Sequence, residues 1–307
     1  MPGRLTVIAS FMQDVSLAIP RSPLAGETMF AGDLTLSAGG KGSNQAVQAA
    51  RCGAEVAVVA AVGQDGGGDG ALQVWQKEGI DTQHVTRIDG VATGTAIILV
   101  EPSGENRIIL AAGANSSLHP KHADAAADII ATSGLVIAQL ESPLETVERA
   151  FAIARAAGVP TLINTAPAPD SLPDSLWQLT DYVVSNRIEA SQLTGLPEET
   201  ALEELARALK TKVGRAALLT AGAEGAIAID QTGNLLRQPA LPAKVIDTTG
   251  AGDAFIGAVA AALVAGASLA QAMEDGVAAG ALACEGRGVV PSLARKPAIN
   301  DRKRLRR

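Results

Sequence analysis

The sequence is poor in aromatic residues and in cysteine, and both shortages limit what the chain can be. Aromatics make up 2% of the 307 residues, so aliphatic side chains and 32 glycines must fill the core, which suits helices packed closely on a parallel sheet. The two cysteines form neither a disulfide framework nor, with the three histidines, a set with metal-ligand spacing. We therefore expect the histidines at the surface and the protein in a reducing, cytoplasmic compartment.

Charged residues are also few, at 19%, and the net charge of -7 leaves no basic surface for a nucleic acid. The basic run 302–307 is expected to be a solvated chain end. The N-terminus lacks the form of a signal peptide. An uncharged run, 254–272, is interpreted as a buried helix, a turn near Gly266 and a second helix, and not as a membrane span.

Two familiar glycine fingerprints are missing. No Gly-x-Gly-x-x-Gly follows the first expected strand, Leu5–Ala9, which argues against a dinucleotide-binding Rossmann domain. The glycine-rich segment Gly39–Ala46 has the wrong spacing for a Walker A loop. A nicotinamide-dependent oxidoreductase is therefore the weakest of the functions considered.

What is present is a repeated alternation of strand, loop and helix, which predicts a mostly parallel sheet covered by helices on both faces. Two β-rich segments, about 12–38 and 92–112, interrupt this alternation and are interpreted as two insertions that form a small β-sheet lid. The sequence has no clean domain boundary, so residues 1–307 are predicted to form a single α/β domain.

The most informative stretch is Asp247–Asp253, which has the pattern of a strand end, a glycine turn and the start of an Ala-rich helix, 251–265. Gly250 and Gly252 allow close approach of a ligand, and the helix directs free N–H groups and its positive dipole end at the same point. Such a corner binds anions, above all phosphate. Asp253 within it is predicted to take a proton from a hydroxyl that attacks a phosphoryl group; the alternative is a simple helix-cap acid.

Further polar residues are expected around this corner. Lys41 and Asn44 lie on the first turn of a helix and offer donors that suit sugar hydroxyls, unless this is a glycine-rich helix start without a ligand. Three acid or amide side chains follow the carboxyl ends of expected strands: Asp14, Glu141 and Asn186. Each alone is better explained as a cap or turn residue, but ligands of open α/β sheets bind at that edge, so their shared placement favours a site.

The segments Gly39–Asn44 and Asp247–Phe255, at their usual separation, resemble the two signatures of the ribokinase (PfkB) carbohydrate kinase family. Shorter matches extend the resemblance over essentially the whole chain: Gly26–Thr28, Gly113–Asn115, Gln139–Pro143, Ala166–Ala168 and Asn186–Glu189. The resemblance implies a ribokinase-like three-layer α/β/α fold with a mostly parallel sheet. It also implies a lid that closes over the sugar and a homodimer formed through that lid.

The resemblance implies roles for individual residues. Asp253 would be the base that deprotonates the sugar, and Gly250, Ala251 and Gly252 the anion hole for the γ-phosphoryl group. The residues implied at the sugar are Met12, Asp14, Gly40, Lys41, Asn44, Glu141 and Asp253. Those implied at ATP are Asn186, Glu189, Thr220, Gly222, Ala223, Gly225 and Gly252, with Mg²⁺ held through the phosphates near Asn186 and Glu189. Those implied at a monovalent cation, expected to be K⁺, are Asp247, Thr249, Ala283, Gly286, Gly288 and Ser292.

The expected activity is transfer of the γ-phosphoryl group of ATP to the terminal hydroxymethyl of a pentose, with D-ribose giving D-ribose 5-phosphate. Met12, Thr165 and Gly286 depart from the family pattern, which usually has Asn, Pro and a charged residue there. Met12 cannot form a strong hydrogen bond, so it admits a less polar sugar substituent. The alternatives are a nucleoside kinase with the base packed on Met12, a kinase for another sugar such as fructose, and a non-catalytic sugar-binding protein.

Overall fold

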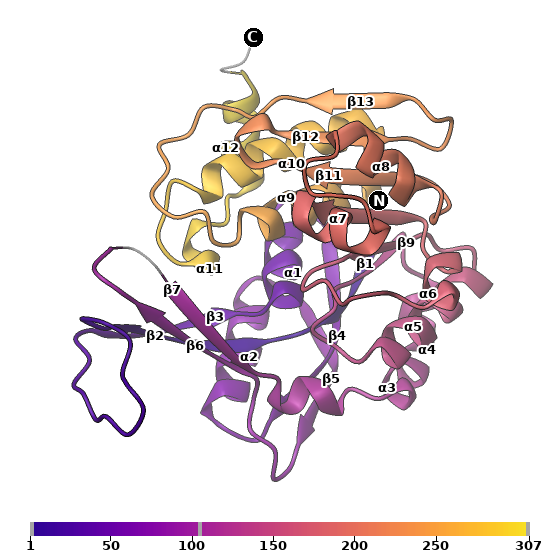
Figure 1. Ribbon diagram of the computed structural model, residues 1–307. Helices are drawn as coiled ribbons and strands as arrows, with labels where there is room; N and C mark the ends of the chain where they lie inside the picture. Colours follow the sequence, from indigo (N-terminus) through magenta and orange to yellow (C-terminus); the bar gives the residue numbers. More distant parts are fainter. Residues whose placement is uncertain (1–2, 104–105, 305–307) are drawn as a thin grey trace.

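The computed structural model describes residues 3–103 and 106–304, and its centre is a nine-stranded sheet (Figure 1). The strands in spatial order are β13 (Leu235–Gln238), β12 (Ala226–Ile229), β11 (Ala216–Thr220), β10 (Tyr182–Asn186), β9 (Thr161–Asn164), β8 (Leu135–Ala138), β1 (Arg4–Ala9), β4 (Glu55–Gly63) and β5 (Asp81–Ile88). β12 pairs antiparallel with both β11 and β13 at one edge, and the other pairs are parallel. The mostly parallel sheet is therefore confirmed.

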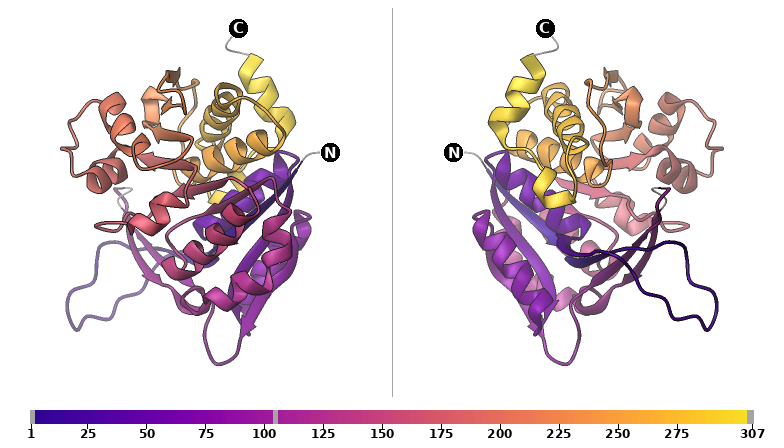
Figure 2. Two further views of the ribbon diagram at one scale, coloured as in Figure 1. Left: turned by 90° about the vertical axis from the view of Figure 1, so that its right-hand side faces the viewer. Right: turned by 90° about the vertical axis from the view of Figure 1, so that its left-hand side faces the viewer.

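The inner strands are apolar on both faces because helices cover both faces (Figure 2). One core cluster joins the sheet to α1 (Lys41–Arg51), α2 (Gly66–Lys77), α9 (Ala251–Val264), α10 (Leu269–Ala283), α11 (Val289–Ser292) and α12 (Lys296–Arg304). The other joins it to α3 (Pro120–Ala125), α4 (Ala127–Ala131), α5 (Leu144–Ala156), α6 (Asp174–Gln178), α7 (Arg187–Thr194) and α8 (Leu202–Lys210). Two 3₁₀ turns are η1 (Gly113–Ser117) and η2 (Gly222–Glu224). These are the three expected layers.

The predicted lid is a second, four-stranded sheet that projects from the body (Figure 1). Its order is β3 (Leu34–Gly39), β2 (Met12–Ala18), β6 (Thr95–Val100) and β7 (Asn106–Ala111). β2 and β6 run parallel, and the two outer pairs are antiparallel. Residues 104–105, between β6 and β7, lie outside the described residues. β2 follows β1 after two residues, so the lid begins directly at the carboxyl edge of the main sheet.

A buried aromatic pair joins the beginning of the lid to the core. Trp75 of α2 is fully buried, and its ring meets that of Phe11 edge-on with centroids 5.7 Å apart. The indole N–H of Trp75 donates to the Ser43 hydroxyl of α1 at 3.0 Å. Because a buried indole N–H needs a partner, this bond fixes the ring between α1 and the first residues of the lid.

Several elements were not expected from the sequence: β5, β13, α6 and α12. The single helix expected over 121–131 is broken at Ala126 into α3 and α4. The uncharged run 254–272 was interpreted correctly, because Gly266, with a φ of 82°, lies between α9 and α10. In the described part of the chain, no helix has the length and apolarity needed to cross a membrane.

The basic run at the C-terminus is more than a solvated chain end, which corrects the prediction. Lys296 and Lys303 of α12 both pair with Asp275 of α10, which is 5% exposed. Arg302 Nη2 lies 2.6 Å from Glu285 Oε2. A buried carboxylate without a partner is costly, so these cations hold α12 against α10. Residues 305–307 lie outside the described residues.

Candidate active site

The first turn of α9 forms a corner at the carboxyl edge of the sheet, as the glycine pattern predicted. The strand end expected before this turn was wrong, because β13 ends at Gln238 and residues 239–250 are irregular. Gly250 is its N-cap, with a φ of 79° that L side chains rarely adopt, and an added Cβ would lie 2.4 Å from Val289 Cγ1. Nothing lies within 4 Å of the position of a Cβ on Gly252. The corner therefore leaves helical N–H groups open to a ligand, at the positive end of the helix dipole.

Asp253 lies inside this corner and is 9% exposed. Its Oδ2 accepts from Asn44 Nδ2 and its Oδ1 from Gln45 Nε2, each at 3.0 Å. Lys41, Asn186, Glu189 and Thr220 line the same small cavity as Asp253. The carboxylate thus faces a cavity shared with residues of both predicted binding segments, and not bulk solvent.

Opposing influences act on the proton affinity of Asp253. Burial raises the pKa of its carboxyl and is the largest effect, with a further increase from the negative Glu141. The positive Lys41 and the hydrogen bonds from Asn44 and Gln45 lower the pKa. A buried carboxylate whose charge is partly relieved in this way has the properties of a general base.

The start of α1 is held by the predicted residue Glu141. Glu141 Oε2 accepts from Lys41 N at 2.9 Å and from the Ser10 hydroxyl at 2.6 Å. Gly42 N in turn donates to Ser10 Oγ at 3.1 Å. An added Cβ at Gly40 would lie 2.8 Å from the Met12 nitrogen, so the glycines allow α1 to begin directly against the start of the lid. Glu141 therefore joins α1 to the carboxyl end of β1.

Asp14 lies on β2 of the lid, close enough to Glu141 to feel its charge. Burial, and to a smaller extent the charge of Glu141, raise the pKa of Asp14 to about 6. A Cβ on Gly39 would lie 2.3 Å from Asp14 Oδ2, so only glycine leaves room for this carboxylate. Two carboxylates near each other favour a ligand that donates hydrogen bonds, as a sugar does.

Met12 is 4% exposed at the first residue of the lid. Asn115 fixes this region, because its Nδ2 donates to Phe11 O at 2.8 Å and its Oδ1 accepts from Phe11 N at 2.9 Å. Asn115 Nδ2 also lies 3.7 Å from Met12 Sδ. The methionine therefore presents an ordered, weakly polar surface where the family pattern has an amide.

Asn186 and Glu189 form a capping box at the start of α7. Asn186 Oδ1 accepts from Glu189 N at 2.8 Å, and Glu189 Oε2 accepts from Asn186 N at 3.0 Å. Thr165 replaces the usual proline, and its hydroxyl donates to Glu189 Oε2 at 2.9 Å. This geometry is therefore compatible with both interpretations of Asn186 and Glu189, as residues that cap α7 and as residues of an ATP and Mg²⁺ site.

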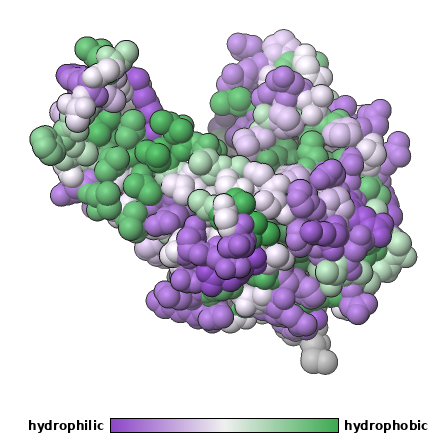
Figure 3. All heavy atoms as spheres, turned by 90° about the horizontal axis from the view of Figure 1, so that it is seen from below, coloured by the Kyte–Doolittle hydropathy of each residue, from purple (hydrophilic) through white to green (hydrophobic). Residues whose placement is uncertain are grey.

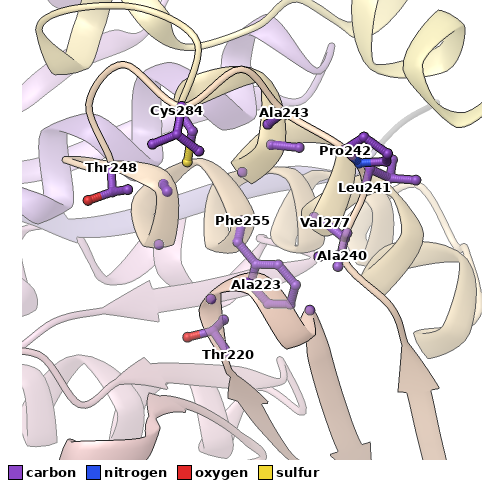
Figure 4. A pocket seen from close by; sticks show the side chains of 18 residues that line it. Thr220, Ala223, Ala240, Leu241, Pro242, Ala243, Thr248, Phe255, Val277 and Cys284 are labelled. Carbon is purple, nitrogen blue, oxygen red and sulfur yellow. The ribbon is translucent and has the colours of Figure 1, made fainter.

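A larger cavity of about 650 Å³ opens on the other side of the α9 corner (Figure 4). Thr220, Gly222, Ala223, Gly225 and Gly252, all predicted at ATP, line it. Sequence reasoning missed the rest of its wall: Ala240–Ala243, Val245, Phe255, Gly276, Val277, Gly280, Ala281 and Cys284. These residues are small or apolar and carry no catalytic pattern. Gly276 and Gly280 lie one turn apart on α10, where a Cβ on Gly276 would lie 2.7 Å from the Phe255 ring, so they allow α10 to pack closely on α9.

The predicted cation residues lie around the loop before α9. Ser292 Oγ is buried without a hydrogen-bond partner among the described residues, and a Cβ at Gly286 would lie 2.2 Å from it. Asp247 Oδ1 accepts from Thr249 N at 2.9 Å, and Asp247 N donates to Cys284 O at 3.3 Å. A buried hydroxyl left without a hydrogen-bond partner in the described part of the chain can serve as one oxygen ligand of an alkali cation.

A buried carboxylate at a helix N-terminus, beside a cavity of about 650 Å³ and a projecting sheet, is an arrangement that suits a kinase acting on a hydroxyl group. The chain belongs to the pfkB family of carbohydrate kinases, whose family model matches residues 3–296. Members of this family are phosphotransferases that act on sugar hydroxyls.

Individual relatives agree with this assignment. The chain is 36% identical to the ribokinase of Haemophilus influenzae over 295 residues, which are 95% of this chain and 96% of the relative. It is 34% identical to the deoxyribokinase of Salmonella typhimurium over 290 residues, 94% of each. The solved structure of Arabidopsis thaliana ribokinase complexed with ribose and ATP has a TM-score of 0.93, 29% identity and 99% coverage of both chains. The three-layer fold predicted from the sequence is confirmed.

Proposed function

We propose that the protein transfers the γ-phosphoryl group of ATP to the terminal hydroxymethyl of a pentose, with D-ribose as the first candidate and D-ribose 5-phosphate as its product. The observation that carries this proposal is the bond between Asn44 and Asp253, which brings the expected sugar donor to the expected base at the anion-binding corner. Relatives named ribokinase, and one solved with ribose and ATP, support the same substrates.

In the proposed reaction Asp253 takes the proton of the sugar hydroxyl. The hydroxyl oxygen then bonds to the γ-phosphorus, and the bond from that phosphorus to the bridging oxygen breaks, which releases ADP. The N–H groups at Gly250, Ala251 and Gly252 stabilise the charge on the transferred group. Met12, Asp14, Gly40, Lys41, Asn44 and Glu141 are proposed to hold the sugar, which leaves the chemistry mainly to positioning and electrostatics.

A second candidate acceptor is 2-deoxy-D-ribose, and Met12 is the residue that favours it. A thioether accepts hydrogen bonds poorly, so a sugar hydroxyl next to Met12 would lose its partner on leaving water. A hydrogen atom at that position would lose nothing. The identity of 34% to a deoxyribokinase supports this candidate, and its nearness to the 36% of a ribokinase leaves both acceptors to be compared directly.

The substrate proposal predicts a clear result in a panel of acceptors. With ATP, turnover is expected with D-ribose and 2-deoxy-D-ribose, and much less with fructose, adenosine, cytidine or inosine. Met12→Asn is expected to raise the ratio of kcat/KM for ribose over deoxyribose by about tenfold, because one hydroxyl regains a hydrogen-bond partner. A coupled assay of ADP release measures both the acceptor preference and the effect of Met12→Asn. Faster turnover of a nucleoside than of either pentose would contradict the proposal.

The raised pKa of Asp14 predicts how sugar affinity depends on pH. Below about pH 6 the carboxyl of Asp14 is protonated in the free enzyme. Because an ionised carboxylate is the stronger acceptor, KM for the pentose should rise up to about tenfold for each pH unit below 6, while KM for ATP changes less. A sugar KM that stays flat between pH 5 and 7 would remove Asp14 from the sugar site.

The same pKa makes Asp14 unfavourable for the stability of the empty protein. The pKa of Asp14 is about 6 in the folded chain and 3.8 in the reference state. Since the folded state binds the proton more tightly, the stabilising contribution is present below pH 3.8 and is lost as pH rises through 6. Asp14→Asn should therefore raise the thermal midpoint at pH 7 and not at pH 3.5.

Metal ions enter the proposal through two sets of residues. Glu189, beside Asn186, offers one carboxylate near the phosphates, which suits Mg²⁺ because this ion keeps several waters and phosphate oxygens as ligands. Asp247, Thr249, Ser292 and the carbonyl groups of Ala283, Gly286 and Gly288 are proposed to hold K⁺. The Ser292 hydroxyl, which has no hydrogen-bond partner among the described residues, supports this second site. Activity that is identical in K⁺ and in tetramethylammonium salts would exclude a functional K⁺ site.

We propose further that residues 1–307 form a single α/β domain, whose lid closes over the sugar. We also propose that the lid joins two copies of the chain. Figure 3 shows hydrophobic residues gathered over the projecting lid. Strand register puts Leu36, Val15, Ile97 and Ile109 in one row across one face, and Leu36 and Ile109 are each 57% exposed. Such a face needs a cover in water, and a second copy provides a matching one. Sedimentation velocity tests this, and a monomer at micromolar concentration would contradict it.

The cytoplasm is the proposed location. The described structure leaves Cys52 and Cys284 as free thiols, which is compatible with a reducing compartment. Cell fractionation followed by immunoblotting tests this proposal.

A further inference from the structure

A connected set of buried amides ends on Asp253, and the roles proposed above do not account for it. Gln139 Nε2 donates to Gln45 Oε1 at 2.7 Å. Gln45 Nε2 donates to Asp253 Oδ1 at 3.0 Å and to Asn164 Oδ1 at 3.1 Å. Gln45 is fully buried, and Gln139 and Asn164 are 1% and 5% exposed. Buried polar groups of this kind are ordered strongly, because any other orientation leaves several of them unpaired.

Gln45 has only one amide orientation that satisfies its surroundings. Its oxygen faces a donor on Gln139, and the two hydrogens of its nitrogen face two acceptors. Asn164 is itself fixed, because its Nδ2 donates to Val184 O at 3.2 Å. Turning the Gln45 amide over would set its oxygen against a carboxylate and a second amide oxygen. Gln139, whose printed bond is to Gln45 and not to Asp253, thus reinforces from the far side of the amide the orientation in which Gln45 donates to Asp253.

The other oxygen of Asp253 is held by Asn44, a side chain whose own oxygen is not paired. Asn44 Nδ2 donates to Asp253 Oδ2 at 3.0 Å, but Asn44 Oδ1 is buried without a hydrogen-bond partner among the described residues. A sugar can therefore donate one hydroxyl to Asn44 Oδ1 while another replaces Asn44 at Asp253 Oδ2. If a sugar hydroxyl replaced Gln45 at Oδ1 instead, Gln45 would lose one of the hydrogen bonds that pair its oxygen and both hydrogens of its nitrogen.

Building on the proposed kinase function, we propose that Gln45, oriented by Gln139, is a positioning residue that holds Asp253 Oδ1, so that Oδ2 is the oxygen that accepts the proton. In the reaction the proton of the sugar hydroxyl moves to Oδ2, the hydroxyl oxygen bonds to the γ-phosphorus of ATP, and ADP leaves. Gln45 neither gives nor takes a proton. Its bond favours the ionised carboxylate, together with Lys41 and Asn44 and against Glu141, which are the other groups that act on Asp253.

The first test is Gln139→Met, which removes the donor to Gln45 without touching Asp253. The acid limb of the pH profile of kcat should move to higher pH, and kcat at pH 7 should fall about 5–10-fold, because Gln45 no longer has a fixed donor orientation. KM for the pentose should stay within about threefold. Gln45→Met should have a larger effect, about 10–100-fold on kcat, since the bond to the carboxylate is lost directly.

The double variant Gln45→Met with Gln139→Met distinguishes an effect of Gln139 that acts through Gln45 from general structural damage. If Gln139 acts only through Gln45, then Gln139→Met should add nothing further in the Gln45→Met background. Gln48→Met is the matched control, because Gln48 is another fully buried glutamine of α1 but donates to Ala294 O at 2.8 Å, away from Asp253. This control should lower the thermal midpoint and leave kcat and its pH profile unchanged.

A readout without turnover distinguishes this proposal from the kinase assignment. In protein labelled with ¹³C at aspartate carboxyls, the Asp253 signal, assigned through Asp253→Asn, should titrate at higher pH in Gln139→Met and Gln45→Met than in the wild type. If the wild type phosphorylates no sugar, the kinase function fails and this titration still decides the role of Gln45. An unchanged titration in both variants, an equal shift in Gln48→Met, or additive effects on kcat would overturn the proposal.

Discussion

Asp253→Asn is expected to lower kcat about 10²–10⁴-fold while sugar and ATP still bind, because a positioned base contributes about that factor and an amide cannot take the proton. The variant should remain folded. Asparagine has nearly the same shape as aspartate. It loses one of the two accepted hydrogen bonds, but it also removes a buried negative charge, whose cost is seen in the raised pKa of the Asp253 carboxyl. Steady-state kinetics and calorimetric titration with the pentose measure the two effects.

Asp181→Asn provides the matched control for this experiment. Asp181 is also a buried aspartate, 8% exposed, but its Oδ2 accepts from Thr161 N at 3.1 Å, at the opposite end of the sheet strands from the α9 corner. This variant should lose stability and keep kcat. Undiminished turnover in Asp253→Asn would remove Asp253 from the mechanism, and an equal loss in both variants would point to general damage.

Gly250→Ala should have the second large effect, a fall in kcat of about 10²–10³-fold, comparable to the loss of an oxyanion donor. The new Cβ would approach Val289 Cγ1 to 2.4 Å, so the turn that directs the N–H groups of α9 at the phosphate must shift. The φ of 79° adds strain of roughly 1–2 kcal/mol for any L side chain.

Gly266→Ala separates the two causes. Gly266 follows the other end of α9, has a nearly equal φ of 82°, and has open space where its Cβ would lie. It should therefore lose stability to a similar extent through backbone strain alone, with kcat retained. Thermal melts and initial rates of both variants test this comparison. Normal turnover in Gly250→Ala would mean that the α9 corner does not hold the transferred group.

Sequence reasoning identified the parts of the fold that depend on local pattern. The glycine turn before α9 was predictable because φ values near 80° and close contacts both demand glycine, as Gly250 illustrates. The strand ends were predictable because β8 and β9 are short apolar runs bounded by loops. By contrast, β5 was missed because it is an edge strand in which every residue is exposed or half-buried, so its sequence carries no apolar run.

The residues that sequence reasoning missed act through contacts made only in the folded chain. Gln45 follows the predicted Asn44 directly, yet its partners, Gln139 and Asn164, are 94 and 119 residues away. Nothing local distinguishes it from Gln48, which lies on the same helix and is equally buried. The basic C-terminal residues were misjudged for the same reason, because Asp275, the acid that Lys303 neutralises, is an ordinary helical residue in sequence.

The scarcity of aromatic residues gives the protein an intrinsic fluorescence probe. Of its two tryptophans, Trp75 lies against Phe11 at the root of the lid and bonds to Ser43 of α1, whereas Trp177 packs in the opposite helical layer beneath Lys212. Emission from Trp75 should therefore respond when the lid changes its angle to the body, and emission from Trp177 should stay constant. With Trp177→Phe, the timing of the proposed lid closure would be measured in stopped flow without any attached dye.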